Sequence, residues 1–165
     1  MGTVTPLIEE RVRFGSNVPD AANQCLQEAA ATPQADRAEA MLTRASVLSP
    51  EVLAVDVARY KFYFYRGQLA EAEAVVRGTL AKAAAQGGFA EDWHQHDQPL
   101  AGREDAEGPQ RYYLYALKAL AFISLRLDDR AQAGEILVAL RLMDPRDLIG
   151  ASVIEDLMAG SEDDE

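Results

Sequence analysis

Residues 50–85 read PEVLAVDVARYKFYFYRGQLAEAEAVVRGTLAKAAA, and this stretch decides the fold. It predicts two helices joined at Gly67, because apolar residues recur at helical spacing on both sides of this glycine. The first of the two helices is apolar on nearly every side, so neighbouring elements must cover it on several sides. The rest of the chain is therefore expected to pack around this pair.

Helical patterns bounded by proline, glycine or capping residues continue on both sides of the central pair. They predict further helices at residues 5–15, 19–31, 36–49, 111–127, 130–143 and 147–159. Asp36 is the expected N-cap of the helix that ends before Pro50. Only residues 59–66 (RYKFYFYR) alternate enough to suggest a strand, and their helical flanks argue against it. The expected fold is therefore all-α.

The composition is that of an ordinary globular chain, with 48% hydrophobic and 26% charged residues in a length of 165. This length favours a single domain, expected over residues 1–160. The single cysteine, Cys25, excludes an internal disulfide and fits a reducing compartment. No apolar run reaches the length of a membrane span and no secretory signal is found, so a cytoplasmic protein is expected.

The net charge is −11, from 16 basic and 27 acidic residues. This charge repels nucleic acid and anionic lipid, so neither a nucleic acid nor a membrane is expected as a partner. It favours a protein or peptide partner with a basic or amphipathic segment. Acidic residues dominate the end of the chain, so residues 161–165 are predicted to form a disordered acidic tail.

The helix pairs repeat one another at fixed spacing. Pro50 follows Ala38, Leu42 and Ala45 at the same offsets at which Pro145 follows another three small or apolar residues: Ala133, Leu137 and Leu140. Further matches to the pattern are Tyr63, Gly67, Ala72, Val76, Leu117, Leu120 and Ala121. This pattern resembles the tetratricopeptide repeat (TPR) family of small bacterial proteins, whose unit is two antiparallel helices of 34 residues.

The resemblance implies an array of about seven to eight helices in antiparallel pairs, with a capping C-terminal helix. A degenerate repeat is expected at 19–52, regular repeats at 53–86 and 114–147, and the capping helix at 147–159. An irregular insertion at 87–113 separates the two regular repeats. Tyr60 stands where the family has a small residue, and Arg59 where it has a leucine, which puts the packing of the central helix in question.

Arrays of this family bind an extended peptide or a helix in a groove lined by the first helix of each repeat. The resemblance therefore implies a set of groove residues: Lys61, Phe64, Tyr65, Tyr115, Lys118, Phe122 and Arg126. Trp93, in the Gly- and Pro-rich part of the insertion at 87–109, is a further candidate, because long loops in compact domains are usually functional or disordered. The alternative is that these aromatic residues belong to the core and the cations to the solvated surface.

No metal site, cofactor or catalytic group is expected. His94, His96 and Asp97 beside Asp92 have weak metal-ligand character, but a committed site needs three or four ligands. Cys25 could be a reactive thiol, although a cysteine on an alanine-rich helix is more often a small core residue. The chain has no nucleotide-binding or hydrolase signature, so no enzyme is expected.

The favoured function is a non-enzymatic adaptor or assembly factor that binds one protein partner through the groove and the 87–109 loop. One alternative is a type III secretion translocator chaperone, which residues 67–74 (GQLAEAEA) resemble. Another is an accessory protein for metalloenzyme assembly, since residues 60–67 and 113–120 (YKFYFYRG and YLYALKAL) resemble small repeat proteins encoded near nitrogen-fixation genes. A metal- or redox-linked accessory that uses His94, His96 and Cys25, and a homodimer formed through the last repeat, also remain open.

Overall fold

The computed structural model describes residues 18–163, and this part of the chain is helical with no strand. It contains seven α-helices and one short 3-10 helix, η1. In chain order they are α2 (Asp20–Ala31), α3 (Ala35–Leu48), α4 (Leu53–Tyr65), α5 (Leu69–Gly87), η1 (Trp93–Gln95), α6 (Pro109–Arg126), α7 (Arg130–Met143) and α8 (Ser152–Asp163). The all-α prediction is confirmed, while the helix predicted at 5–15 lies outside the described residues.

The chain divides into two compact units, with the boundary inside α5 between Val75 and Val76. The first unit holds α2, α3, α4 and the start of α5, and the second holds the remainder. The expectation of one domain over 1–160 stays a prediction. Among the described residues, no helix combines the length and the hydropathy that crossing a membrane requires.

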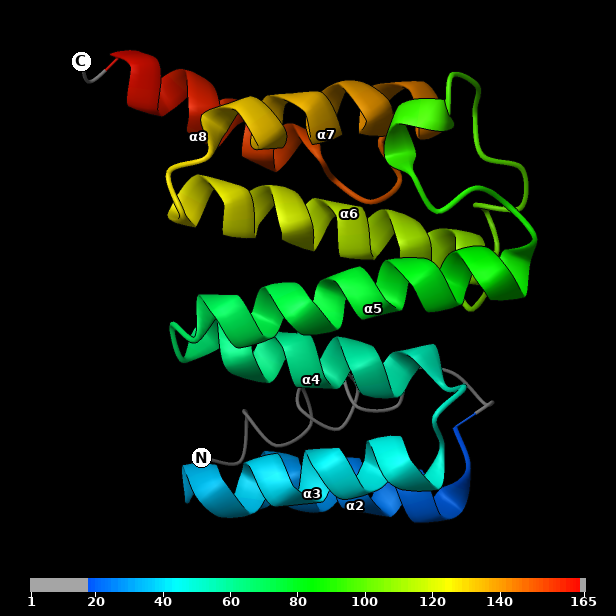
Figure 1. Ribbon diagram of the computed structural model, residues 1–165, viewed down its shortest axis with the longest axis vertical. Helices are drawn as coiled ribbons and strands as arrows, with labels where there is room; N and C mark the ends of the chain where they lie inside the picture. Colours follow the sequence, from blue (N-terminus) through cyan, green and yellow to red (C-terminus); the bar gives the residue numbers. More distant parts are fainter. Residues whose placement is uncertain (1–17, 164–165) are drawn as a thin grey trace. The chain divides into compact units, whose positions relative to one another are not determined.

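In the first unit, α2 and α3 form a tightly packed pair, drawn in blue and cyan in Figure 1. Alanines at the contact, such as Ala22 and Ala45, are fully buried and let the helices approach closely. Leu26 of α2, Leu42 of α3 and Val55 of α4 belong to the same hydrophobic core. Gln34, and not Asp36, is the N-cap residue of α3, so the predicted cap is wrong: Asp36 lies within the first turn.

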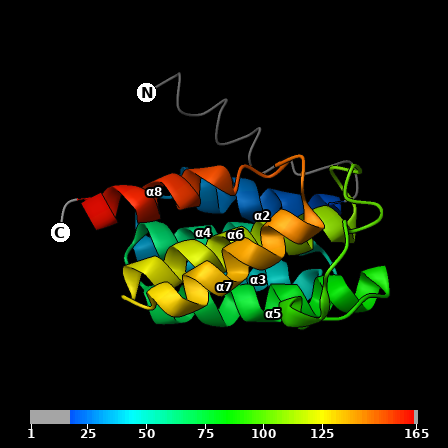
Figure 2. The same cartoon turned by 90° about the horizontal axis from the view of Figure 1, so that it is seen from above.

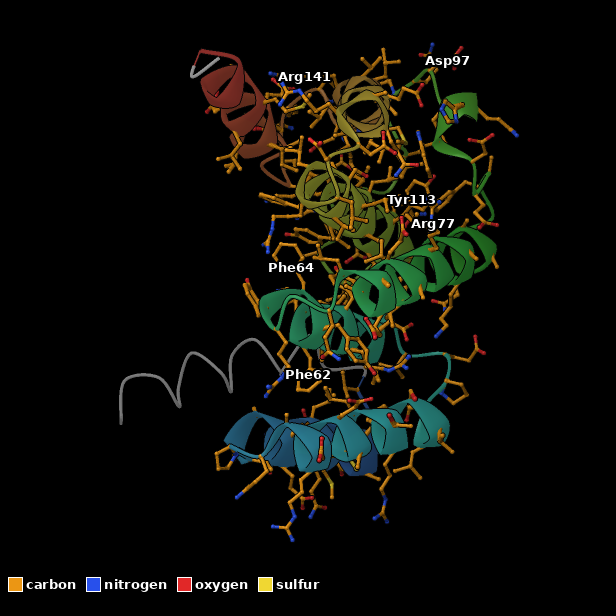
Figure 3. The ribbon with its side chains drawn as sticks, turned by 60° about the vertical axis from the view of Figure 1, so that its left-hand side comes forward. Phe62, Phe64, Arg77, Asp97, Tyr113 and Arg141 are labelled. Carbon is orange, nitrogen blue, oxygen red and sulfur yellow. The ribbon has the colours of Figure 1, made fainter. Side chains whose placement is uncertain are left out.

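The central helix α4 is buried on several sides, as its apolar sequence predicts. Tyr60, which stands where the TPR pattern has a small residue, is itself buried. Phe62 and Phe64 leave α4 in different directions (Figure 3), and Phe62 packs on the core of the first unit. Gly67 ends the helix with φ 74°, and the Gln68 amide donates to the Tyr63 carbonyl at 2.9 Å. This is a Schellman motif, which reverses the chain into α5.

In the second unit, α6 and α7 form the next packed pair. Their fully buried side chains include large apolar ones, such as Tyr113, Leu117, Ile136 and Met143. Helix α8 contacts α6 and lies beside the pair in Figure 2. Its Glu155 accepts two hydrogen bonds, at 2.8 and 2.7 Å, from the Arg141 guanidinium of α7.

Three predicted boundaries need correction. The irregular segment is 88–108 and not 87–113, because α6 begins at Pro109, whose missing amide proton costs nothing in a first turn. Helix α8 begins at Ser152 and not at residue 147. The turn before it is held by Asp144, which accepts the amides of Leu148 and Ile149 at 3.1 Å each. The acidic tail predicted at 161–165 is helical as far as Asp163, where α8 ends.

Candidate functional site

The segment between α5 and α6, residues 88–108, is called the insertion below. It belongs to the second unit, and hydrogen bonds of its backbone attach it to the helices of that unit. The Tyr113 hydroxyl donates to the Glu91 carbonyl at 2.6 Å, and the Leu100 amide donates to the Met143 carbonyl at 2.9 Å. The Arg111 Nε donates to the Arg103 carbonyl at 2.7 Å. These bonds attach the insertion to α6 at one side and to the end of α7 at the other.

An aromatic cluster forms the base of the insertion. The rings of Phe89 and Tyr113 meet edge to face, with their centroids 5.0 Å apart. The His96 ring completes the cluster, 5.9 Å from Phe89 and 5.8 Å from Tyr113, and its Nε2 lies 2.7 Å from the Ala90 carbonyl oxygen. Burial raises the pKa of Tyr113, so its hydroxyl stays protonated and can donate the hydrogen bond to Glu91.

A second anchor joins the insertion to the end of α7. The Arg103 side chain is mostly buried, and its NH1 group donates to the Leu100 carbonyl at 3.2 Å. Its Nε lies 4.0 Å from Oδ1 of Asp144, the carboxylate that also holds the turn before α8. A buried cation and a buried anion thus face each other where the insertion, α7 and the α8 turn meet.

His94 links the insertion to the outer face of α7. Its Nδ1 lies 2.8 Å from Oδ1 of Asp92, and its Nε2 lies 3.3 Å from Oε2 of Glu135. The hydrogen bond to Asp92 has the larger effect on the pKa of His94 and the bond to Glu135 the smaller one. Both raise this pKa above its ordinary value of 6.5. The hydrogen bonds from the His94 amide and ring hold the pKa of Asp92 below its ordinary value.

A hollow of about 500 Å³ opens between α5 and the insertion. Its lining is mixed, with apolar, cationic and acidic side chains: Arg77, Leu80, Ala90, Glu91, Asp92, Trp93 and Gln95. Arg77, labelled on α5 in Figure 3, donates from its NH2 group to the Gln132 side chain of α7 at 3.3 Å. The hollow is therefore bounded by α5 and the insertion, and its volume lies within the range for binding sites.

The predicted groove residues of the first unit lie on one face of α4. Lys61, Phe64 and Tyr65 follow helical spacing, and the Phe64 and Tyr65 rings meet edge to face at 5.6 Å. Tyr65 is 73% exposed, an unusual position for a large aromatic side chain. Lys61 and Phe64 are half-buried, so Tyr65 is the exposed member of this predicted set.

The other predicted partner-binding residues lie in the second unit, on α6 and in the insertion. Tyr115 is 38% exposed, Arg126 is exposed, and Phe122 is half-buried. Lys118 has a role within the chain, because its ammonium donates to the Ile149 carbonyl at 2.8 Å and so holds the start of α8. Trp93 is half-buried at the wall of the hollow.

The weak metal candidates are not brought together. The His94 ring faces Asp92 and Glu135, the His96 ring packs on Phe89, and Asp97 is exposed at the outer part of the insertion (Figure 3). Within residues 18–160, no group of three or more histidine, cysteine or carboxylate side chains could hold a metal ion. Cys25 is a free, buried thiol in the core of the first unit.

Three contributors to this site have no sequence motif. Glu135 contacts a histidine 41 residues away, and Tyr113 contacts the backbone of Glu91 22 residues away. Arg77 lies on α5 at helical spacing from Leu80, and this position does not distinguish it from any other exposed helical arginine. These contacts depend on how the insertion folds back, and local periodicity carries no information about that.

Comparison with known proteins gives one relative of unassigned function. The chain is 29% identical, over 124 residues, to the "Uncharacterized 19.8 kDa protein in nifW 5'region" of Azotobacter chroococcum mcd 1. The match covers 74% of this chain and 70% of that protein. No protein-family profile matches the chain, and no solved structure matches it.

Proposed function

We propose that this chain is a non-enzymatic protein-interaction module, an adaptor or assembly factor that holds a protein partner. The observation that carries the proposal is the insertion, whose backbone is anchored to α6 and α7 while Glu91, Trp93 and Gln95 line an open hollow. An anchored segment with an exposed outer face can bind a partner without a large ordering cost. The TPR-like character of the helix pairs and a cytoplasmic location are part of the same proposal.

The exposed aromatic residue on α4 provides a second contact surface. Tyrosine at interfaces combines a large apolar ring with a hydrogen-bonding hydroxyl, and truncation of such residues often costs much of the binding energy. Tyr65 is exposed and stacks only edge-on with its neighbour Phe64. It is therefore the first-unit residue on which partner affinity is proposed to depend.

Affinity capture from the source organism, followed by mass spectrometry, tests the proposal. The wild type and three variants are compared: Tyr65→Ser, Glu91→Lys and a control, Val47→Ser. Val47 is 74% exposed on α3, so the control removes a side chain as exposed as that of Tyr65. The first two variants should retain about tenfold less partner than the control. Recovery of nothing except further copies of this chain would contradict the adaptor proposal.

A role in nitrogenase-related assembly is a second candidate, favoured by one observation. The similar Azotobacter protein is named for its place beside nifW. If this chain serves the same process, its transcript should rise several-fold when fixed nitrogen is withdrawn from the source organism. An unchanged transcript level would remove this candidate and leave the general adaptor proposal standing.

A further inference from the structure

The His94 ring lies between two carboxylates that come from different elements. Asp92 belongs to the insertion and caps η1, where its Oδ1 also accepts the His94 amide at 3.0 Å. Glu135 belongs to α7. A neutral imidazole has one N–H donor, whereas the protonated ring has two, so only the protonated ring can donate to both carboxylates at once.

The charges around this ring favour its protonated form. Asp92 and Glu135 face its two nitrogens, at 2.8 and 3.3 Å, and both hydrogen bonds raise its pKa. The charged residue of α5 that lines the hollow is Arg77, which donates a hydrogen bond to the Gln132 side chain. When the ring loses its proton, one of its nitrogens becomes an acceptor that faces a carboxylate, and that contact becomes repulsive.

We infer that His94 is a proton-dependent clasp that holds the wall of the hollow, formed by Asp92 and Trp93, against α7. The clasp is closed below the pKa of His94, as long as both carboxylates carry their charge, and it opens as the pH rises through that pKa. The other anchors of the insertion, at Glu91 and Leu100, do not involve His94. Opening is therefore local to residues 92–95.

The consequence for partner binding rests on the proposed function. If the insertion is the partner-binding surface, the shape of that surface depends on pH through His94. The clasp itself is a property of the isolated chain and can be measured without a partner. A failed capture experiment would thus leave the clasp intact, and a failed clasp experiment would leave the adaptor proposal intact.

Trp93 provides the measurement, because it is the only tryptophan in the sequence and its ring lies 5.2 Å from the His94 ring. We expect its fluorescence to titrate between about pH 5 and pH 9. The midpoint should lie above 6.5, the ordinary pKa of histidine. Glu135→Gln should lower the midpoint by roughly half a unit, since it removes one of the two charges. His94→Gln should remove the transition.

Asp156→Asn is the matched control, because it removes one negative charge from an exposed position on α8 that is not part of the hollow. Its midpoint should equal that of the wild type. Circular dichroism of each variant shows whether the fold is retained. A wild-type midpoint at or below 6.5, an unchanged midpoint in Glu135→Gln, or a transition that persists in His94→Gln would overturn the clasp.

Discussion

Tyr113 holds the insertion through both its hydroxyl group and its ring. Its side chain is fully buried, and its hydroxyl donates to the Glu91 carbonyl at 2.6 Å. Its ring also contacts the rings of Phe89 and His96. The neighbouring Tyr112 is also buried in the second unit, and burial raises its pKa to about 12, but its hydroxyl bonds to no other described residue.

This contrast gives a matched pair of substitutions. Tyr113→Phe removes the hydroxyl and leaves the Glu91 carbonyl without its donor, which should lower the free energy of unfolding by roughly 1–2 kcal/mol. Tyr112→Phe should change it by less than about 0.5 kcal/mol. Urea denaturation followed by circular dichroism measures both. Equal losses in the two variants would show that the Glu91 bond contributes nothing.

The two helix-pair turns are built in the same way from different residues. Gly67 between α4 and α5 has φ 74°, and Asp128 between α6 and α7 has φ 63°. In the second turn, the Asp129 amide donates to the Ser124 carbonyl at 2.8 Å, as Gln68 donates to Tyr63 in the first. Both turns are Schellman motifs, and the residue at the left-handed position is strained unless it is glycine.

Two glycine-to-alanine substitutions separate backbone strain from steric contact. A Cβ added at Gly67 or at Gly78 would meet no atom within 4 Å. Gly67→Ala should lower the free energy of unfolding by about 1 kcal/mol, because an alanine must adopt a positive φ. Gly78→Ala, inside α5, should raise it by up to about 1 kcal/mol through helix propensity. A loss of stability in both variants would contradict the conformations given to these two glycines.

The helices could be predicted from the sequence, and the arrangement of the insertion could not. Apolar periodicity and the boundaries at Pro50 and Gly67 give α3, α4 and α5 to within a few residues. The predicted start of the capping helix is too early. The Asp144 carboxylate accepts two backbone amides of the preceding segment, which therefore forms a turn and not the first turn of the helix. Short-range patterns determine helices, whereas the turn before α8 depends on which side chains find backbone donors.

Part of the candidate site could be located from the sequence. Trp93 and Tyr65 are predicted partner-binding residues, and the fold adds that Trp93 lines the hollow and that Tyr65 is exposed. Their role in partner binding stays a prediction. The role of Lys118 within the chain was missed, because its acceptor at Ile149 is 31 residues away. His94 was considered for metal binding, and its contact with Glu135, 41 residues away, became visible only in the fold.

The net charge of −11 of the whole chain affects how fast a charged partner associates with it. It should accelerate the approach of a basic segment and slow that of an acidic one, and dissolved salt screens both effects. The amount of partner captured should therefore fall when sodium chloride is raised from about 0.05 M to about 0.5 M. Increased capture at high salt would indicate an apolar contact in place of the electrostatic one.

The central claim is that the insertion binds the partner, and site-specific photo-crosslinking tests it most directly. A photoreactive phenylalanine derivative is introduced either at Gln95, which lines the hollow, or at Thr43, which is exposed on α3. The account predicts one crosslinked protein at Gln95, its loss in the Glu91→Lys background, and no specific product at Thr43. Equal crosslinking at the two positions, or crosslinking at Gln95 only to another copy of this chain, would contradict it.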